Sequence, residues 1–222
     1  MLVNADFSRR VTMTPADYRW IASPQGGVER MMLDRLGGER ARATSIVRYA
    51  PASRFSLHEH PGGEEIFVLS GVFSEGRDHY PSGWYLRNPP GSSHQPYSLD
   101  GAIIFVKLWQ MPPTDSERVR VDTNARAAWQ RRGRAAVCPL FSGDTEQVSL
   151  HRLPPREPLF DGEVGTAELL VLAGAVKAGR LSCKRGTWIR LPAGEYPEFS
   201  AGESGALFYI KTGHLTEAGL KG

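Results

Sequence analysis

The stretch "HEHPGGEEIFVLSGVF", residues 58–73, places two histidines and two glutamates directly before a run of β-branched and aromatic residues. His58 and His60 are two residues apart, so on a strand both side chains point to the same face. A Pro-Gly-Gly turn follows, and Glu64 then opens a second strand, where its carboxylate can converge on the histidines. We therefore expect two strands that carry polar side chains into the interior of a β domain.

Short segments of this kind recur along the whole chain. The 222 residues include 24 glycines and 16 prolines, which often mark turns. The segments 44–51, 65–73, 83–89 and 102–109 are each predicted as strands bounded by turn residues. We therefore expect an all-β fold, with helix limited to short windows.

The sequence repeats at an offset of 103 residues, because "EIFVLSGV" from Glu65 recurs as "ELLVLAGA" from Glu168. The same offset pairs Gly71 with Gly174, Gly76 with Gly179, Gly83 with Gly186, Arg87 with Arg190, and Pro89 with Pro192. Glycines and prolines set turns that only a shared backbone would place alike. We therefore predict two tandem copies of one module, residues 1–112 and 113–222, in a double jelly roll.

Composition and charge exclude several classes of function. The net charge is +3 and no basic stripe interleaves with aromatics, so no nucleic-acid partner is expected. No apolar run reaches the roughly 18 residues of a membrane span, and the amino terminus lacks the apolar core of a signal peptide. Cys138 and Cys183 form no CxxC motif, which suits a reducing compartment. We expect a cytoplasmic protein that does not bind membranes.

His94, which follows the turn "NPPGSSH", completes a candidate metal site with His58, His60 and Glu64. Three imidazoles and one carboxylate suit zinc, iron, nickel, copper or manganese. Four protein ligands fill the tetrahedral shell of zinc, which favours a structural or sensing role. Iron, nickel or manganese would keep two positions for substrate and dioxygen. We expect one divalent metal ion in the first module, with zinc favoured and iron, nickel or manganese as alternatives.

The same residues resemble the two motifs of the cupin family. The pattern H-x-H-x3-E-x6-G over residues 58–71 resembles the first cupin motif, and G-x5-P-x-G-x2-H over residues 83–94 resembles the second. The resemblance implies a double-stranded β-helix in tandem, a bicupin. It also transfers the metal-ligand roles to the three histidines and Glu64.

Within the cupins, "HPGGEEIFVLSGVF" and "YPSGWYLRNPPGSSHQP" are similar to the ChrR-like cupins, whose founding members regulate extracytoplasmic-function sigma factors. This resemblance implies a regulatory or stress-associated metal-binding protein. The family's anti-sigma domain binds zinc through a His-x3-Cys-x2-Cys motif that this sequence lacks, so sigma-factor binding is doubtful. ChrR-like cupins also resemble dioxygenases of small ketones. The alternative is therefore a metal-dependent dioxygenase of a small diketone or phenolic ketone, with Glu64 as the candidate base.

Glu65 is expected to have a structural role. Neighbouring strand residues face opposite ways, so if Glu64 points inward then Glu65 points outward. Its match at Glu168 favours pairing with an arginine, for which Arg87 and Arg190 are the shared candidates.

The second copy keeps the scaffold without the ligands. The offset places Asp161 opposite His58, Glu163 opposite His60, Ala167 opposite Glu64 and Pro197 opposite His94. We predict a metal-free module that serves as a scaffold, closes one side of the first site or forms a dimer interface. Because an open sheet edge needs cover, we expect a homodimer. A small-molecule ligand is expected in the first module.

Overall fold

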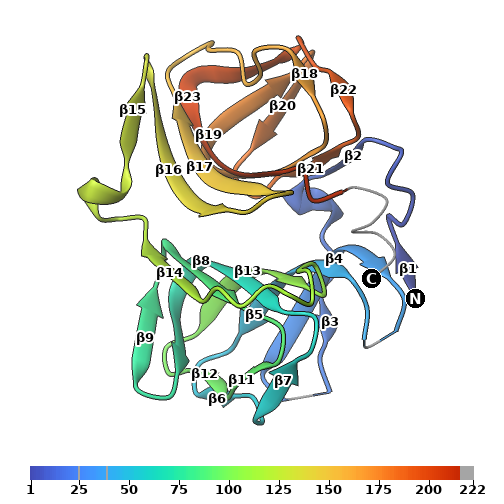
Figure 1. Cartoon of the computed structure of the whole chain (residues 1–222), viewed down its shortest axis with the longest axis vertical. Coiled ribbons are helices and arrows are strands. Elements are labelled where there is room, and N and C mark those ends of the chain that lie inside the picture. Colours follow the sequence, from blue (N-terminus) through green and yellow to red (C-terminus); the bar gives the residue numbers. More distant parts are fainter. Residues whose placement is uncertain (25, 39, 216–222) are drawn as a thin grey trace. The chain divides into compact units, whose positions relative to one another are not determined.

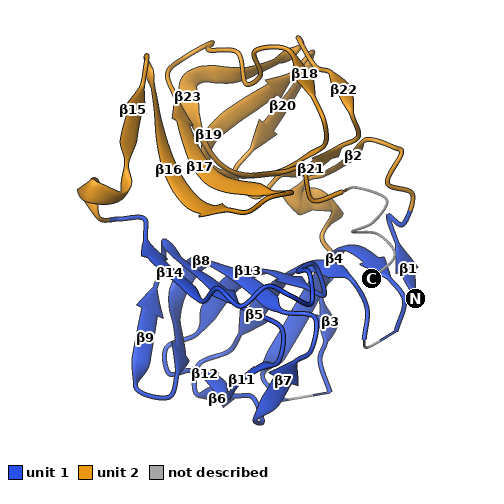
Figure 2. Cartoon of the chain, viewed as in Figure 1, with its two compact units in different colours: residues 1–5, 19–124, 218–222 blue, residues 6–18, 125–217 orange. Residues whose placement is uncertain are grey.

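The computed structural model describes residues 1–24, 26–38 and 40–215 of the chain. The chain divides into two compact units, which Figure 2 draws in different colours. Unit 1 contains residues 1–5 and 19–124, and unit 2 contains residues 6–18 and the described residues from 125 onward.

Both units consist of antiparallel strands, as the sequence predicts. In the described ranges the helices are two 3₁₀ turns, η1 (Pro15–Asp17) and η2 (Arg126–Ala128). None of the helices in these ranges is long and apolar enough to cross a membrane. The prediction of an all-β fold is confirmed.

Unit 1 is built around one large antiparallel sheet, whose main path is β1-β4-β5-β13-β8-β10-β14. Strands β4, β5, β13 and β8 of this sheet can be followed in Figure 1. Strands β7 and β11 form a separate two-stranded sheet. The core lies on the inner face of β8 and β13, where Ile66, Val68, Ile104 and Val106 are buried together. The strands of this unit are β1 (Leu2–Val3), β3 (Ile21–Ala22), β4 (Val28–Leu36), β5 (Ala43–Tyr49), β6 (Ser53–Arg54), β7 (His58–His60), β8 (Glu64–Glu75), β9 (Asp78–Pro81), β10 (Trp84–Asn88), β11 (Ser92–His94), β12 (Pro96–Ser98), β13 (Ala102–Leu108) and β14 (Val119–Asp122).

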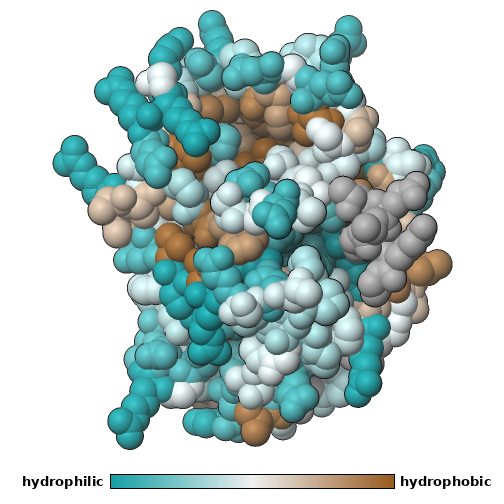
Figure 3. Space-filling view, in the orientation of Figure 1, coloured by the Kyte–Doolittle hydropathy of each residue, from teal (hydrophilic) through white to brown (hydrophobic). Residues whose placement is uncertain are grey.

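Unit 2 repeats this plan, with its sheet in the order β15-β16-β17-β23-β19-β21-β2. Its interior is apolar: Leu169, Val171 and Phe208 belong to one buried cluster. In Figure 3 apolar residues lie recessed in this unit and hydrophilic side chains protrude around them. The strands are β2 (Val11–Met13), β15 (Gln130–Arg132), β16 (Ala135–Ser142), β17 (Gln147–Leu153), β18 (Glu163–Val164), β19 (Ala167–Ala178), β20 (Leu181–Lys184), β21 (Trp188–Leu191), β22 (Gly194–Glu195) and β23 (Phe199–Thr212).

The strand registers follow the offset found in the sequence. On β8 and β10, Glu65 is paired with Arg87, and on β19 and β21 Glu168 is paired with Arg190. Each residue of the second pair lies 103 positions after its counterpart in the first. The repeat therefore reflects two copies of one backbone.

Gly71 and its counterpart Gly174 show why glycine recurs at this position. Their φ angles are 70° and 66°, in the left-handed region that favours glycine. A Cβ atom at either position would also overlap a carbonyl oxygen, that of Gly101 in unit 1 and that of Gly205 in unit 2. These glycines let the long central strand of each unit approach its neighbour closely.

One of the two edge strands of each large sheet comes from the segment that precedes the other copy in the chain. In unit 2, β2 pairs with β21 and aligns Val11 with Arg190. In unit 1, β14 pairs with β10 and aligns Val119 with Arg87. A border between residues 112 and 113 would assign residues 6–18 to the first unit and residues 113–124 to the second. In the structure residues 6–18 lie in unit 2 and residues 113–124 lie in unit 1. That border, as the boundary of two independent domains, stays a prediction.

Candidate metal centre

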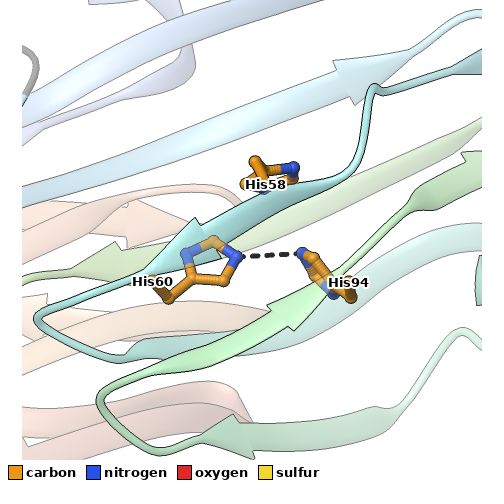
Figure 4. A group of neighbouring side chains, drawn as sticks. All are labelled: His58, His60 and His94. Atoms are coloured by element: carbon orange, nitrogen blue, oxygen red, sulfur yellow. Dashed lines mark hydrogen bonds between the residues drawn. The ribbon is translucent and has the colours of Figure 1, made fainter.

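Strands β7 and β11 bring the three predicted histidines together. The two strands pair antiparallel, and His94 lies directly opposite His58 in their register. His60 and His94 are buried, with their Nε2 atoms 3.0 Å apart. One ligand atom from each of the three imidazoles lies within 4.8 Å of the others. Figure 4 shows the rings converging from the two strands, so the cluster can hold a metal ion.

Glu64 reaches the same point from the first residue of β8. Its Oε2 atom lies 3.4 Å from Nε2 of His60 and 3.4 Å from Nε2 of His94. Ligand atoms about 2.1 Å from one metal ion are roughly 3.0 Å apart at right angles and about 3.4 Å apart at tetrahedral angles. The spacing of His60, Glu64 and His94 therefore fits a single ion, and the four-residue ligand set with His58 stays a prediction.

The Pro-Gly-Gly turn before Glu64 depends on its two glycines. A Cβ atom on Gly62 would overlap the ring of Trp109, and one on Gly63 would overlap the side chain of Met111. Trp109 itself has a φ of 57° and donates a backbone hydrogen bond to the carbonyl of Gly63 at 3.3 Å. This close packing fixes the start of β8 beside the end of β13, where Glu64 faces the histidines.

Hydrogen bonds to the other ring nitrogens orient two of the imidazoles. His94 Nδ1 lies 2.6 Å from Oε2 of Glu75, and His58 Nδ1 lies 2.9 Å from the carbonyl oxygen of Ser56. Both partners are acceptors, so the Nδ1 atoms carry the protons and donate. The Nε2 lone pairs are then left for a metal ion, as is usual for ligating histidines.

Glu75 belongs to a network behind the cluster. Its Oε1 accepts hydrogen bonds from Nη2 of Arg120 at 2.6 Å and from the hydroxyl of Tyr80 at 3.3 Å. Burial alone would raise the pKa of Glu75, but the hydrogen bonds from His94 and Arg120 outweigh it and lower the pKa to about 2. Arg120 Nη2 also donates to Oδ1 of Asn88 at 2.7 Å. Glu75 is therefore a fixed negative charge next to His94.

The pKa values of the two buried imidazoles shift in opposite directions. Burial lowers the pKa of His60, which keeps this ring neutral near pH 7. Burial would also lower the pKa of His94, but its hydrogen bond with Glu75 and the charge of Glu64 reverse the direction and raise it. The neutral His60 ring is available as a ligand, and the charges of Glu64 and Glu75 favour a cation at the point between the Nε2 atoms.

Sequence reasoning missed Glu75, Asn88 and Arg120. Strict alternation from Glu64 places Glu75 on the outer face of β8, but β8 has a bulge: Val68 pairs with Ile104 and Ser70 with Ile103, so Leu69 is left over. The extra residue returns Glu75 to the inner face. Arg120 lies on β14, beyond the predicted first module. No local pattern in the sequence marks the bulge in β8 or the contribution of β14 to this unit.

A cavity of about 580 Å³ opens next to the cluster within unit 1. Its lining includes His58, His60 and Glu64, so a bound molecule would lie against the candidate metal centre. The apolar part of the lining includes Val28, Val47, Tyr49, Phe55, Val106 and Trp109. Such a cavity, apolar with a few charged groups, has the form of a small-molecule site.

At the positions of unit 2 that are equivalent to the four candidate ligands, the polar residues are exposed and the other residues are apolar. Asp161, Glu163 and Pro197 are exposed, and Ala167 is buried in the apolar core. The positions equivalent to Glu75 and Asn88 are Ala178 and Leu191, which belong to the same core. The residues of the ligand set and of the network behind it are thus replaced together, and a metal-free unit 2 stays a prediction.

Glu65 has the structural role expected for it. The side chain is buried, and its Oε2 accepts a hydrogen bond from Nη1 of Arg87 at 3.2 Å. Arg87 also forms an ion pair with Asp115. The prediction that Glu65 pairs with this shared arginine is confirmed.

Comparison with known proteins agrees with this architecture. Similar solved structures include a "putative dioxygenase" from Nostoc punctiforme, with 16% identity and a TM-score of 0.71 over 98% of this chain and 84% of that one. A bacterial pirin from Escherichia coli in complex with nickel(II) has 10% identity and a TM-score of 0.67 over 92% of this chain and 98% of that one. A cupin 2 conserved barrel domain protein from Leptotrichia buccalis has 15% identity and a TM-score of 0.60 over 86% of this chain and 91% of that one.

At these identities the structural similarity shows the fold alone. A search of curated proteins found no significant match. Residues 8–112 match the family of ChrR Cupin-like domains, which agrees with the motifs in the sequence. The chain therefore has the cupin fold, and the part of it that is similar to the ChrR Cupin-like domains is residues 8–112.

Proposed function

We propose that unit 1 binds one divalent transition-metal ion through His58, His60, Glu64 and His94 and oxidises a small molecule with dioxygen in the adjoining cavity. The observation that carries this proposal is the cavity itself, about 580 Å³ in volume and lined by three of these four residues. A purely structural ion needs no such space beside it.

The substrate class that fits this site is a small diketone or phenolic ketone. Bound metal would act as a Lewis acid that lowers the pKa of an enol or phenol, and it would bring dioxygen next to the substrate. The apolar walls around Tyr49, Phe55 and Trp109 would hold the body of the substrate and exclude water. Glu64, which accepts a hydrogen bond from Nδ2 of Asn88 at 3.1 Å, is the candidate base for the substrate proton. A reaction of this class consumes one dioxygen per substrate and leaves both oxygen atoms in the products.

A regulatory metal sensor is the second candidate. It is favoured by the match of residues 8–112 to the ChrR Cupin-like family. In this case zinc would fill the site with its four protein ligands, and a change at the metal would be read by a partner protein. The network from His94 through Glu75 to Arg120 offers a route by which such a change would reach β14.

Metal analysis and oxygen uptake distinguish the two candidates. The protein is purified without chelators or a nickel column, its metal content is measured, and samples loaded with iron, manganese, nickel or zinc are given β-diketones and hydroxyacetophenones. We expect oxygen consumption with at least one of iron, manganese and nickel. Stoichiometric zinc as isolated, with no uptake for any loaded metal, would support the sensor and reject the oxygenase.

The ligand assignment is tested by a matched pair of variants. His94→Ala should lower metal content and abolish oxygen uptake, whereas Glu163→Ala, at the position equivalent to His60 in unit 2, should change neither. Equal metal retention in both variants would show that the assignment is wrong.

A further inference from the structure

Arg30 is a cation in the wall of the cavity. It lies on β4 opposite Val47 of β5, and both residues line the cavity. The half-buried guanidinium makes one long hydrogen bond, from Nη2 to Oγ of Ser23 at 3.5 Å. Across residues 1–24, 26–38 and 40–215, no carboxylate forms an ion pair with it. Because a guanidinium has five N–H donors, Arg30 can bind a ligand without breaking an internal ion pair.

The charges around Arg30 favour an anion. Of the described residues that line the cavity, three are arginines, Arg30, Arg35 and Arg40, and two are glutamates, Glu59 and Glu64. Glu64 is assigned to the metal ion, which itself adds positive charge. The charged side chains of the lining therefore carry a positive formal charge in sum, which favours an anionic ligand.

Arg30 and the candidate ligands His58, His60 and Glu64 line the same cavity, so one molecule that fills it would contact both. Tyr49, on β5, connects the two. Burial raises the pKa of its phenol, the charge of Glu64 raises it further, and the charge of Arg30 lowers it. Both charges therefore act on one buried side chain of the cavity wall.

We infer that the cavity selects small ketones that carry a remote carboxylate, which Arg30 binds while the enol or phenol end reaches the metal centre. This inference rests on the proposed function, because it assigns the substrate class of the same site. Arginine binds carboxylates through two parallel hydrogen bonds, which give orientation as well as affinity. Arg30 is thus a specificity-determining residue, and the metal ligands are needed for either kind of ketone.

The test uses the full chain loaded with zinc, which is redox-inert, so binding is measured without turnover. The probes are succinylacetone, a β-diketone with a carboxylate at its far end, and its neutral methyl ester. By isothermal titration calorimetry, the acid should bind at least about tenfold more tightly than the ester. In Arg30→Gln this ratio should fall to about one, while the affinity for the ester stays within about twofold of wild type.

Arg48→Gln is the matched control. Arg48 lies on β5 and forms an ion pair with Glu29 at 2.6 Å, and it does not belong to the cavity lining. Its loss should leave the ratio of acid to ester affinity unchanged. Thermal unfolding of Arg30→Gln, compared with wild type, shows whether the fold is retained, and Arg30→Lys should keep part of the preference.

The outcomes separate the two proposals. Equal binding of acid and ester to wild type, or an unchanged ratio in Arg30→Gln, would overturn the anion inference and leave the proposed function standing. Loss of both ligands in Arg30→Gln would also overturn it, because the role would then be structural. Failure of wild type to bind either ligand, or binding that survives in His94→Ala, would overturn the proposed function and the anion site with it.

Discussion

At the scale of single residues, Glu75 fixes the tautomer of the candidate metal ligand His94 although it lies outside the histidine motif. Its carboxylate accepts from Nδ1 of His94 at 2.6 Å and is held by Arg120 on its other oxygen. This arrangement fixes the tautomer and the orientation of the His94 ring. Residues in such positions commonly change metal affinity by about 10–100-fold when they are replaced.

We predict that Glu75→Gln lowers zinc affinity by roughly 10–100-fold. An amide oxygen accepts the Nδ1 hydrogen bond more weakly than a carboxylate does, and the substitution also removes the negative charge beside the imidazole. Competition with a chromophoric chelator measures the change. Glu163→Gln serves as the control and should bind zinc like wild type; the same result for Glu75→Gln would mean that the carboxylate does not support the site.

His151 should make the stability of the protein depend on pH. Burial lowers the pKa of His151 to about 4, helped by the charge of Arg132. In the unfolded chain the pKa is about 6.5, so the unfolded state binds the proton more readily. The contribution of His151 to stability is therefore complete above pH 6.5 and is lost as the pH falls from 6.5 to about 4.

We predict that the free energy of unfolding falls more steeply over this interval in wild type than in His151→Phe, by up to about 3 kcal/mol. Phenylalanine preserves the ring contact with Phe208, whose centroid lies 5.5 Å from that of His151, and cannot titrate. Denaturant unfolding at both ends of the interval measures the difference. Because every other titrating group is the same in both proteins, parallel pH profiles would refute a role for this histidine.

At the scale of elements, the long central strand of each unit combines a bulge with a glycine. In β8 the bulged residue is Leu69, and in β19 it is the equivalent Leu172, which the register between Val171 and Ala173 leaves over. In unit 1 the bulge returns Glu75 to the inner face of the strand. The same backbone feature thus occurs in both units, but only in unit 1 does it bring a carboxylate to the candidate metal centre.

We predict that Gly71→Ala destabilises the protein well beyond Gly76→Ala. Both residues have positive φ, 70° and 59°, so each substitution carries a backbone cost of about 1–2 kcal/mol. A Cβ at Gly76 meets nothing within 4 Å, whereas one at Gly71 overlaps the carbonyl of Gly101 and forces β8 and β13 apart. Denaturant unfolding of the two variants compares them, and equal losses would contradict the close approach of these strands.

At the scale of the whole molecule, the first unit is not complete at residue 112. Strand β14 covers the edge of β10 and supplies Arg120, which contacts both Glu75 and Asn88. The ligand set lies within residues 58–94, but the network that orients it includes this later strand.

We predict that a fragment of residues 1–124 binds zinc roughly 10–100-fold more tightly than a fragment of residues 1–112. The longer fragment keeps β14 and Arg120, and the shorter one leaves the edge of β10 open. Zinc titration of both fragments, with circular dichroism to compare their β content, measures the effect. In the longer fragment Arg120→Gln separates the guanidinium from the strand; if all three proteins bind zinc equally, β14 has no part in the site.

The sequence by itself determined the fold class, the repeat and the candidate ligands His58, His60, Glu64 and His94. These depend on patterns that the sequence shows directly: strand alternation, turn glycines and the spacing within each motif are local, and the repeat is the recurrence of such local patterns 103 residues later. Only the tertiary structure decided that Glu75 faces His94, that Arg120 supports the site from β14 and that Arg30 lines the cavity. These placements depend on a bulge and on strand pairings between residues far apart in the chain, whose energies no local pattern encodes.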